Sequence, residues 1–264
     1  MFLASIRKLL IIFKWNMLTT GASSGIGRAT ALRFAEEGAS VALLGRDHSA
    51  LEETSAAVEG LGASSVTVVA DLNENTQCRA AVDETVAFKG RLDVLVNVAG
   101  IIASGDLAST TEEGWAEMMR INLDCVFVLM QAALPYLQTT AGNIVNVSSV
   151  TGLRAFPGVL AYCVSKAGLD QLTRCAALEL AESGVRVNAV NPGVVVSNLH
   201  RRGGMQENAY EEFLEHSKTT HPIGRVGQPK DIAEAIIYLA SRQAGWVTGV
   251  TLSLDGGRHL TCAR

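Results

Sequence analysis

The stretch of sequence that decides the fold reads Thr20-Gly21-Ala22-Ser23-Ser24-Gly25-Ile26-Gly27. A short strand-like run precedes it, and a helical pattern follows in which Ala29, Leu32 and Ala35 recur every three residues until Gly38 ends it. Glycine permits backbone angles and close approaches that a Cβ would block, so unpaired amides at the start of this helix can face an anion. The helix dipole favours the same anion. This context predicts a loop that binds the pyrophosphate of a dinucleotide; the alternative is a glycine turn that binds nothing.

Short apolar runs rich in valine recur along the rest of the chain, each of a length suited to a strand buried on both faces. They lie at residues 41–44, 66–70, 92–96, 144–147, 185–190 and 250–254. Helical stretches separate them, and the clearest follows Pro229 and places Ile232, Ile236 and Leu239 on one face. This alternation predicts a single-domain α/β Rossmann fold, a doubly wound parallel sheet of about seven strands flanked by helices. Ligands of such sheets bind beyond the carboxyl ends of the strands.

Length and composition limit the class of protein. The 264 residues suffice for one well-buried α/β domain and are too few for two joined by a linker. Hydrophobic residues make up 48% and charged residues 18%, which excludes disorder, and the net charge of -4 offers no basic footprint for nucleic acid. The cysteines form no C-x-x-C pair, so we expect reduced thiols and an intracellular location, with the cytoplasm favoured.

The first sixteen residues have an unusual composition. Arg7, Lys8 and Lys14 surround an apolar run at 9–13, and no acidic residue appears before Glu36. So short an apolar run cannot cross a bilayer, and we expect no transmembrane span. We interpret residues 1–16 as an N-terminal extension and 17–264 as the dinucleotide-binding and catalytic domain. A mitochondrial targeting segment or a membrane-surface anchor is the alternative for the first sixteen residues.

The end of the second predicted strand bears on the choice of dinucleotide. Gly45-Arg46 stands where an acidic residue would hold the ribose 2′-hydroxyl of NAD(H). An arginine can instead pair with the 2′-phosphate of NADP(H). NADP(H) is therefore favoured over NAD(H), and a solvated surface arginine beside Asp47 is the alternative.

A tyrosine and a lysine four residues apart suggest proton transfer. Tyr162 and Lys166 begin a predicted helix, share one of its faces, and lie opposite a face that we expect to carry Leu169 and Ala176. A tyrosine titrates near pH ~10, so it exchanges protons near neutrality only if a nearby positive charge stabilises its phenolate. Lys166 could supply that charge. Ser149, just beyond the predicted strand 144–147, could hydrogen-bond and polarise a substrate oxygen.

In their order along residues 20–257 these motifs resemble the short-chain dehydrogenase/reductase family in its compact, single-domain form. The resemblance implies a catalytic tetrad of Asn122, Ser149, Tyr162 and Lys166. In that family the tyrosine transfers the proton, the lysine also holds the nicotinamide ribose, and the asparagine holds a water that links the lysine to solvent. The implied reaction interconverts a carbonyl and a secondary alcohol by hydride transfer, on a small-molecule substrate.

The resemblance also implies the cofactor-binding positions, to which Arg46 is added on the argument above. They are Gly21, Ser23, Ser24, Gly25, Ile26, Gly27, Asp71, Leu72, Asn97, Ala99, Gly100, Tyr162, Lys166, Pro192, Gly193, Val195 and Ser197. Three stretches depart from the family pattern. Val98 replaces an asparagine, Ser197 replaces a threonine, and the first strand carries the polar Asn16 and Thr19, which must find partners if the strand is buried.

The segment from Ser197 to Gly224 is predicted to be a mobile lid over the substrate. Arg201 and Arg202 could attract an acidic substrate or be a solvated pair, and Phe156, Leu160 and Leu199 could line an apolar pocket. The histidines lack metal-ligand spacing, so we expect no metal site.

Two other classes remain as alternatives. A nucleotide-sugar epimerase or dehydratase uses a similar pair of residues in longer chains, and a dinucleotide-binding sensor or scaffold could keep the fold without turnover. By resemblance we expect a homodimer or homotetramer.

Overall fold

The computed structural model describes residues 15–261. Seven parallel strands form one sheet in the order β3-β2-β1-β4-β5-β6-β7. The strands are β1 (Asn16–Thr20), β2 (Ser40–Gly45), β3 (Ser65–Val69), β4 (Val94–Asn97), β5 (Asn143–Val147), β6 (Arg186–Pro192) and β7 (Thr251–Leu254). The strand order reverses between β1 and β4, which is the switch point at which ligands bind in doubly wound sheets. The predicted Rossmann fold with about seven strands is confirmed, and the strand ends differ by one or two residues.

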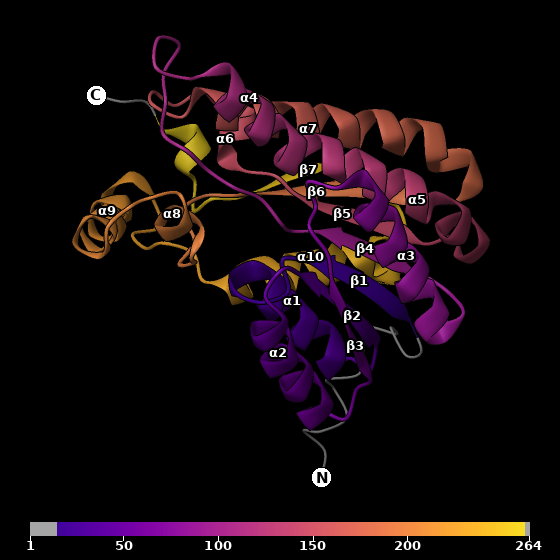
Figure 1. The fold of residues 1–264 in the computed structure, drawn as a ribbon. Coiled ribbons are helices and arrows are strands. Elements are labelled where there is room, and N and C mark those ends of the chain that lie inside the picture. Colours follow the sequence, from indigo (N-terminus) through magenta and orange to yellow (C-terminus); the bar gives the residue numbers. More distant parts are fainter. Residues whose placement is uncertain (1–14, 262–264) are drawn as a thin grey trace.

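Helices cover both faces of this sheet (Figure 1). They are α1 (Gly25–Glu36), α2 (His48–Gly60), α3 (Asn75–Lys89), α4 (Glu112–Met119), α5 (Cys125–Thr140), α6 (Val150–Leu153), α7 (Leu160–Leu180), α8 (Leu199–Arg202), α9 (Glu207–Thr220) and α10 (Pro229–Ala240). One apolar cluster packs α3, α5 and α7 on one face of the sheet. A second packs α1, α2 and α10 on the other. Helices α8 and α9 stand apart from both layers, beyond the carboxyl ends of the strands (Figure 1).

The polar residues of β1 have different surroundings. Asn16 is fully buried, and its side-chain nitrogen donates to the carbonyl oxygens of Thr85 at 2.8 Å and Arg91 at 2.7 Å. Its backbone N–H donates to the buried carboxylate of Asp93 at 2.8 Å. The hydroxyl of Thr19 has no partner among the described residues. Asn16 therefore ties the start of β1 to α3 and to the segment before β4. The remaining predictions for residues 1–14 lie outside the described residues.

One continuous helical stretch, Glu112–Thr140, has the length and the mean hydropathy of 1.2 that a membrane-crossing helix needs. It consists of α4, one turn of π-helix at Arg120–Asp124, and α5. Half of its most apolar window is buried inside the fold, where α5 packs against α3 and the sheet. The apolar character of this stretch is thus that of a core helix.

Candidate active site

The glycine loop between β1 and α1 has the backbone that the sequence predicts. Gly21 and Gly25 have φ angles of +66° and +54°, a region that glycine enters without the steric cost of a Cβ. A Cβ on Gly27 would lie 2.3 Å from the carbonyl oxygen of Gly21. The three glycines therefore let the start of α1 approach the end of β1, as a pyrophosphate-binding loop requires.

The threonine that opens this loop joins it to the neighbouring strand. The hydroxyl oxygen of Thr20 accepts hydrogen bonds from the backbone N–H groups of Val98 and Ala99, both at 2.9 Å. Because these are backbone donors, valine at position 98 leaves them intact. Asn97 points elsewhere: it is buried, and its side chain donates to Asn146 at 2.9 Å. Asn97 thus fastens β4 to β5.

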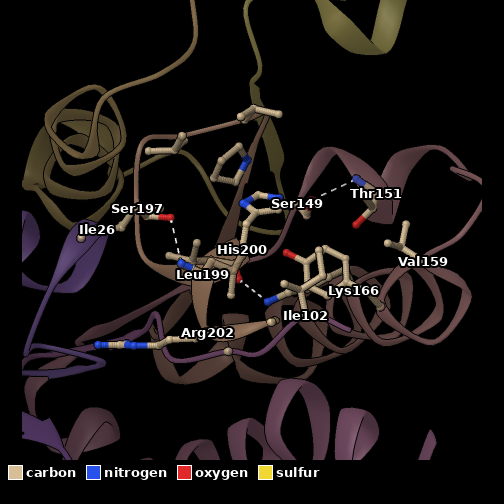
Figure 2. A pocket seen from close by; sticks show the side chains of 18 of the residues that line it. Ile26, Ile102, Ser149, Thr151, Val159, Lys166, Ser197, Leu199, His200 and Arg202 are labelled. Carbon is tan, nitrogen blue, oxygen red and sulfur yellow. Dashed lines mark hydrogen bonds between the residues drawn. The ribbon is translucent and has the colours of Figure 1, made fainter. Parts of the chain in front are cut away.

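A cavity of about 620 Å³ opens at the carboxyl ends of the central strands. It brings together most of the predicted site residues, namely Gly21, Ser24, Gly25, Ile26, Gly27, Ala99, Gly100, Ser149, Tyr162, Lys166, Pro192, Gly193, Val195 and Ser197. The residues that do not line it are Ser23, Arg46, Asp71, Leu72, Asn97 and Asn122. Figure 2 shows Ser149 and Lys166 on one side of this cavity and Ser197, Leu199 and Arg202 on the other.

Tyr162 and Lys166 lie in the first turns of α7, at the floor of the cavity. The ammonium nitrogen of Lys166 donates to the carbonyl oxygen of Val147 at 2.9 Å and lies 5.8 Å from the centre of the Tyr162 ring. Both side chains are buried, on the same helix face as Leu169 and Ala176. The prediction that these apolar residues occupy the opposite face is wrong, because positions seven apart fall on one side of a helix.

Burial sets the proton affinities of the pair. It lowers the pKa of Lys166 to about 8, although Asp170 partly opposes the shift. Burial also raises the pKa of Tyr162 to about 12, and hydrogen bonding to the Ser149 side chain acts in the opposite direction. Burial thus outweighs the hydrogen bond with Ser149, and the stabilisation of the Tyr162 phenolate by Lys166 stays a prediction.

Ser149 forms the N-cap of α6, where its hydroxyl oxygen accepts from the backbone N–H of Thr151 at 3.2 Å. The hydroxyl hydrogen bonds to Tyr162, whose pKa this hydrogen bond lowers, and it can turn to a substrate oxygen that binds beside the two side chains. The strand end thus supplies a hydrogen-bond donor beside Tyr162, as predicted from its position after β5.

Asn122 lies in the π-helical turn, the kind of irregularity that is frequent at functional sites. Its side-chain oxygen accepts from the backbone N–H of Ile101 at 2.9 Å. Its nitrogen donates to the carbonyl oxygen of Ile101, the sulfur of Met118 and the hydroxyl of Ser165. The amide nitrogen is fully engaged, whereas the oxygen accepts one bond and keeps a second lone pair, so the predicted water stays a prediction. It fixes the Gly100-Ile101 loop against α7.

Sequence reasoning missed Asp170, a carboxyl group buried beneath the pair. It is 1% exposed, burial raises its pKa, and one of its oxygens accepts from the Asn191 side chain at 2.8 Å. Asp170 raises the pKa of Lys166, which burial lowers. The sequence does contain a pattern that indicates Asp170, because this residue follows Lys166 by one helical turn and lies on the same helix face.

The outer wall of the cavity comes from the predicted lid. Phe156 and Leu199 line the cavity as predicted, whereas Leu160 does not. Arg201 is occupied elsewhere, because it donates two 2.6 Å hydrogen bonds to Glu207 and stacks 3.9 Å over the Tyr210 ring. In residues 15–261 no cluster of three side chains could hold a metal ion.

His221, just after α9, holds the cavity floor from the lid side. Its side chain is 2% exposed, and its Nε2 accepts from the backbone N–H of Val194 at 3.1 Å. Its Nδ1 contacts the carbonyl oxygen of Ser217 at 2.6 Å, which fixes the proton on Nδ1. A Cβ on Gly193 would lie 2.6 Å from Nε2, so only glycine fits beside this ring.

The topology, the glycine loop and the buried Tyr162–Lys166 pair beside Ser149 define an NAD(P)-dependent oxidoreductase. A family profile described as Enoyl-(Acyl carrier protein) reductase matches residues 21–259. The 3-oxoacyl-[acyl-carrier-protein] reductase FabG of Thermotoga maritima is 39% identical over 241 residues, covering 91% of this chain and 96% of that protein.

Solved structures agree with these sequence matches. A short-chain dehydrogenase/reductase of unknown function from Caenorhabditis elegans, solved with cofactor, superposes with a TM-score of 0.90 at 36% identity, covering 95% of this chain and 97% of that one. Carveol dehydrogenase from Mycobacterium avium, in complex with NAD, has a TM-score of 0.89 at 29% identity, covering 96% and 100%. The chain belongs to the short-chain dehydrogenase/reductase family.

Proposed function

We propose that the protein is an NADP(H)-dependent oxidoreductase that interconverts a carbonyl and a secondary alcohol, with Tyr162 as the acid/base. The observation that carries the proposal is the placement of Ser149, Tyr162 and Lys166 together at the floor of one cavity, which the glycine loop also lines. When bound, the nicotinamide supplies or accepts the hydride. The FabG of Thermotoga maritima, named for a 3-oxoacyl reductase activity, supports a carbonyl substrate.

Residues of the chain itself then transfer the proton. The Ser149 hydroxyl donates a hydrogen bond to the substrate oxygen, and the Tyr162 hydroxyl gives that oxygen a proton as it gains negative charge. Lys166, held by the carbonyl oxygen of Val147, lies close enough to favour the phenolate that this transfer leaves. Asn122 is a positioning residue, because it holds the loop that packs against Lys166. The reverse reaction uses the same groups.

The site fits a dinucleotide on two structural grounds. The loop glycines leave a cradle that a Cβ on Gly27 would fill, and the predicted pyrophosphate and nicotinamide segments line a single cavity. Gly21 and Ser24 to Gly27 would hold the pyrophosphate. Pro192, Gly193, Val195 and Ser197 would face the nicotinamide end.

The preference for NADP(H) rests on Arg46. It is exposed at the end of β2 and has no ion pair or side-chain hydrogen bond within residues 15–261. Its guanidinium is therefore available to a 2′-phosphate outside the cavity. The carboxylate of Asp71, assigned to adenine by resemblance, already accepts from the backbone and side chain of Asn73.

We propose further that the protein is a homodimer or homotetramer. Large apolar side chains are exposed on its outer helices and near its C-terminal segment: Phe127 at 51%, Val164 at 44%, Leu178 at 82%, Trp246 at 100% and Leu260 at 75%. Burying such side chains in a symmetric interface would remove them from water. Size-exclusion chromatography with light scattering measures the state, and a monomer at micromolar concentration would contradict it.

We place the protein in the cytoplasm, supported by its free thiols at Cys78, Cys125, Cys163 and Cys175. Imaging of the full chain and of a form lacking residues 1–14, which keeps Asn16 in β1, tests this with each form fused to a fluorescent protein. A mitochondrial signal that needs those fourteen residues would favour the targeting alternative.

The decisive experiment is a titration of purified protein with NADPH and with NADH, followed by turnover on diketones, oxoacyl thioesters and oxosteroids. We expect tighter binding of NADPH, and an Arg46→Ala variant should lose that preference by about tenfold, as expected for loss of a charge-assisted pair, while its NADH affinity is unchanged. Dinucleotide binding without turnover on any panel member would instead favour the sensor.

A further inference from the structure

One wall of the cavity carries a cation that the proposed chemistry does not use. Arg258 lies in a short 3-10 turn after β7, lines the cavity, and has its guanidinium carbon 4.9 Å from the centre of the Phe156 ring. Within residues 15–261 this guanidinium has no side-chain hydrogen bond and no ion pair. A guanidinium has five N–H donors, so Arg258 presents unsatisfied donors to a largely apolar space.

The nearest acid is already occupied. Asp255 is buried, and its carboxylate accepts from the backbone N–H groups of Gly257 and His259 and from the His259 ring. Burial lowers the pKa of Arg258, the charge of Asp255 opposes this shift, and a second cation, Arg154, adds to it. Asp255 makes no direct ion pair with this half-buried guanidinium, so its N–H donors remain open to an anion that could pair with them directly.

A second polar group beside Arg258 lacks a partner. The Nδ1 atom of His200 is buried and unbonded within the described residues. The His200 ring stacks on Phe213 at 4.6 Å between ring centres and lines the same cavity (Figure 2). Burial lowers the pKa of His200, and the nearby Arg258 cation lowers it further. Two open donor or acceptor groups thus share this part of the wall.

The fold holds Arg258 in place by its backbone. Arg154 donates from one guanidinium nitrogen to the carbonyl oxygens of Arg258 and His259, at 3.3 and 3.1 Å, and to that of Thr261. These bonds fasten the tail to the segment after α6. The cation is therefore presented by a braced turn and not by a free chain end.

We propose that Arg258, with His200 beside it, binds an anionic group of the substrate, a carboxylate or a phosphate ester, while Ser149 and Tyr162 act on its carbonyl or alcohol. The inference rests on the proposed function, because it assigns the substrate class of the same site. An oxo or hydroxy acid would bring its own carboxylate, whereas a pantetheine thioester would bring its phosphate. A planar guanidinium can pair with either anion through two hydrogen bonds.

Calorimetry on the protein saturated with NADP+ tests the binding directly and does not depend on turnover. The probes are two matched pairs: 5-hydroxyhexanoate with its methyl ester, and 3-hydroxybutanoyl pantetheine with its 4′-phosphate. We expect the charged member of at least one pair to bind about tenfold or more tightly, as one charge-assisted pair provides. The pair that shows the larger preference identifies carboxylate or phosphate as the source.

Variants then assign the preference to Arg258. Arg258→Met should remove it, with the uncharged member changing less than about threefold, and Arg258→Lys should keep part of it because the charge remains. Arg258→Gln replaces the methionine variant if that one does not fold. Arg174→Met, which removes a surface charge on α7, is the matched control and should preserve the preference. Equal binding of charged and uncharged probes, or an unchanged preference in Arg258→Met, would overturn the inference.

Kinetics separate this inference from the proposed function. Turnover of the uncharged panel compounds that disappears in Tyr162→Phe supports the carbonyl chemistry whatever Arg258 does. Binding of the charged probes without turnover of any compound would support the anion site and contradict the proposed reaction.

Discussion

The floor and the outer wall of the cavity are built on different principles. On the floor, Asn122, Lys166 and Asp170 are buried and bonded to groups from several other elements, and among their side chains only one oxygen of Asp170 has no partner within the described residues. On the wall, Arg258 and His200 keep polar groups without partners among the described residues. Closed networks hold catalytic groups in one geometry, whereas open groups remain available to a ligand. The comparison therefore assigns catalysis to the cavity floor and substrate selection to the outer wall.

Tyr162→Phe gives the largest expected effect, because it removes the proton donor from the floor and leaves the ring. We expect kcat to fall by about 10³-fold, in the range that general acid catalysis contributes, with dinucleotide affinity within about threefold of wild type. Absorbance loss at saturating substrate and a dinucleotide titration measure the two.

Tyr136→Phe is the matched control, since it removes an exposed hydroxyl on α5 that contacts Asp83 at 3.3 Å. It should retain full activity. Equal turnover in Tyr162→Phe and wild type would remove Tyr162 from the mechanism.

Gly27→Ala tests how closely the glycine loop packs on the cofactor side of the cavity floor. The added Cβ would lie 2.3 Å from the carbonyl oxygen of Gly21, so β1 and α1 must separate. We expect a loss of about 3 kcal/mol in the free energy of unfolding, at the upper end for overpacking, and weaker dinucleotide binding. Urea unfolding and the same titration measure both.

Gly60→Ala is the control for the glycine substitution, because its Cβ would meet nothing within 4 Å at the end of α2. It should be neutral or stabilise by up to about 1 kcal/mol. A Gly27→Ala protein as stable as wild type would show that the loop can accommodate a Cβ, contrary to the close approach in the structure.

The difference between floor and wall also explains what the sequence could predict. Valine runs, loop glycines and Tyr162–Lys166 are local patterns with strong physical constraints, and the sheet, the loop and the shared helix face followed from them. The partners of Asn16 come from α3 and the segment before β4, about 70 residues away, and no local pattern announces them. Arg258 reaches the cavity only because the tail folds back beside Phe156, which depends on tertiary contacts.

His221→Ala tests whether His221, on the lid side of the cavity, helps to hold the backbone of the cavity floor in place. It would leave the backbone N–H of Val194 buried without an acceptor, which costs about 1–3 kcal/mol. We expect a loss of that size in unfolding free energy and a higher KM for the dinucleotide, with kcat less affected. His221→Asn can accept the same hydrogen bond and should recover part of the unfolding free energy and part of the dinucleotide affinity. Equal losses of stability and affinity in the two variants would show that the ring contributes only by filling space.

The pH dependence of stability tests the burial of Lys166. Its folded pKa of about 8 lies below the ordinary lysine value of 10.5, so between these values the unfolded chain binds more protons. Stability conferred by this group therefore rises with pH across that window, by no more than about 1.4 kcal/mol per pH unit.

We expect Lys166→Met to lose this rise when unfolding is followed by urea titration between pH 7.5 and 9.5 at roughly half-unit steps, below the range in which Tyr162 titrates. The quantity to compare is the slope of wild type minus that of the variant. Parallel profiles for the two proteins would show that Lys166 is solvated in the folded state.

Arg201→Met has the smallest expected effect and compares Arg258 with a lid arginine that does not line the cavity. Arg201 has partners on both sides, Glu207 and the Tyr210 ring, but the pair is exposed, and exposed ion pairs contribute little. We expect a melting temperature and kcat/KM for charged and uncharged substrates indistinguishable from wild type. Arg258→Met, the same substitution at an arginine that lines the cavity, should change the preference between charged and uncharged substrates. If Arg201→Met changed it equally, anion selection would belong to the positive field of the whole lid and not to the open guanidinium of Arg258.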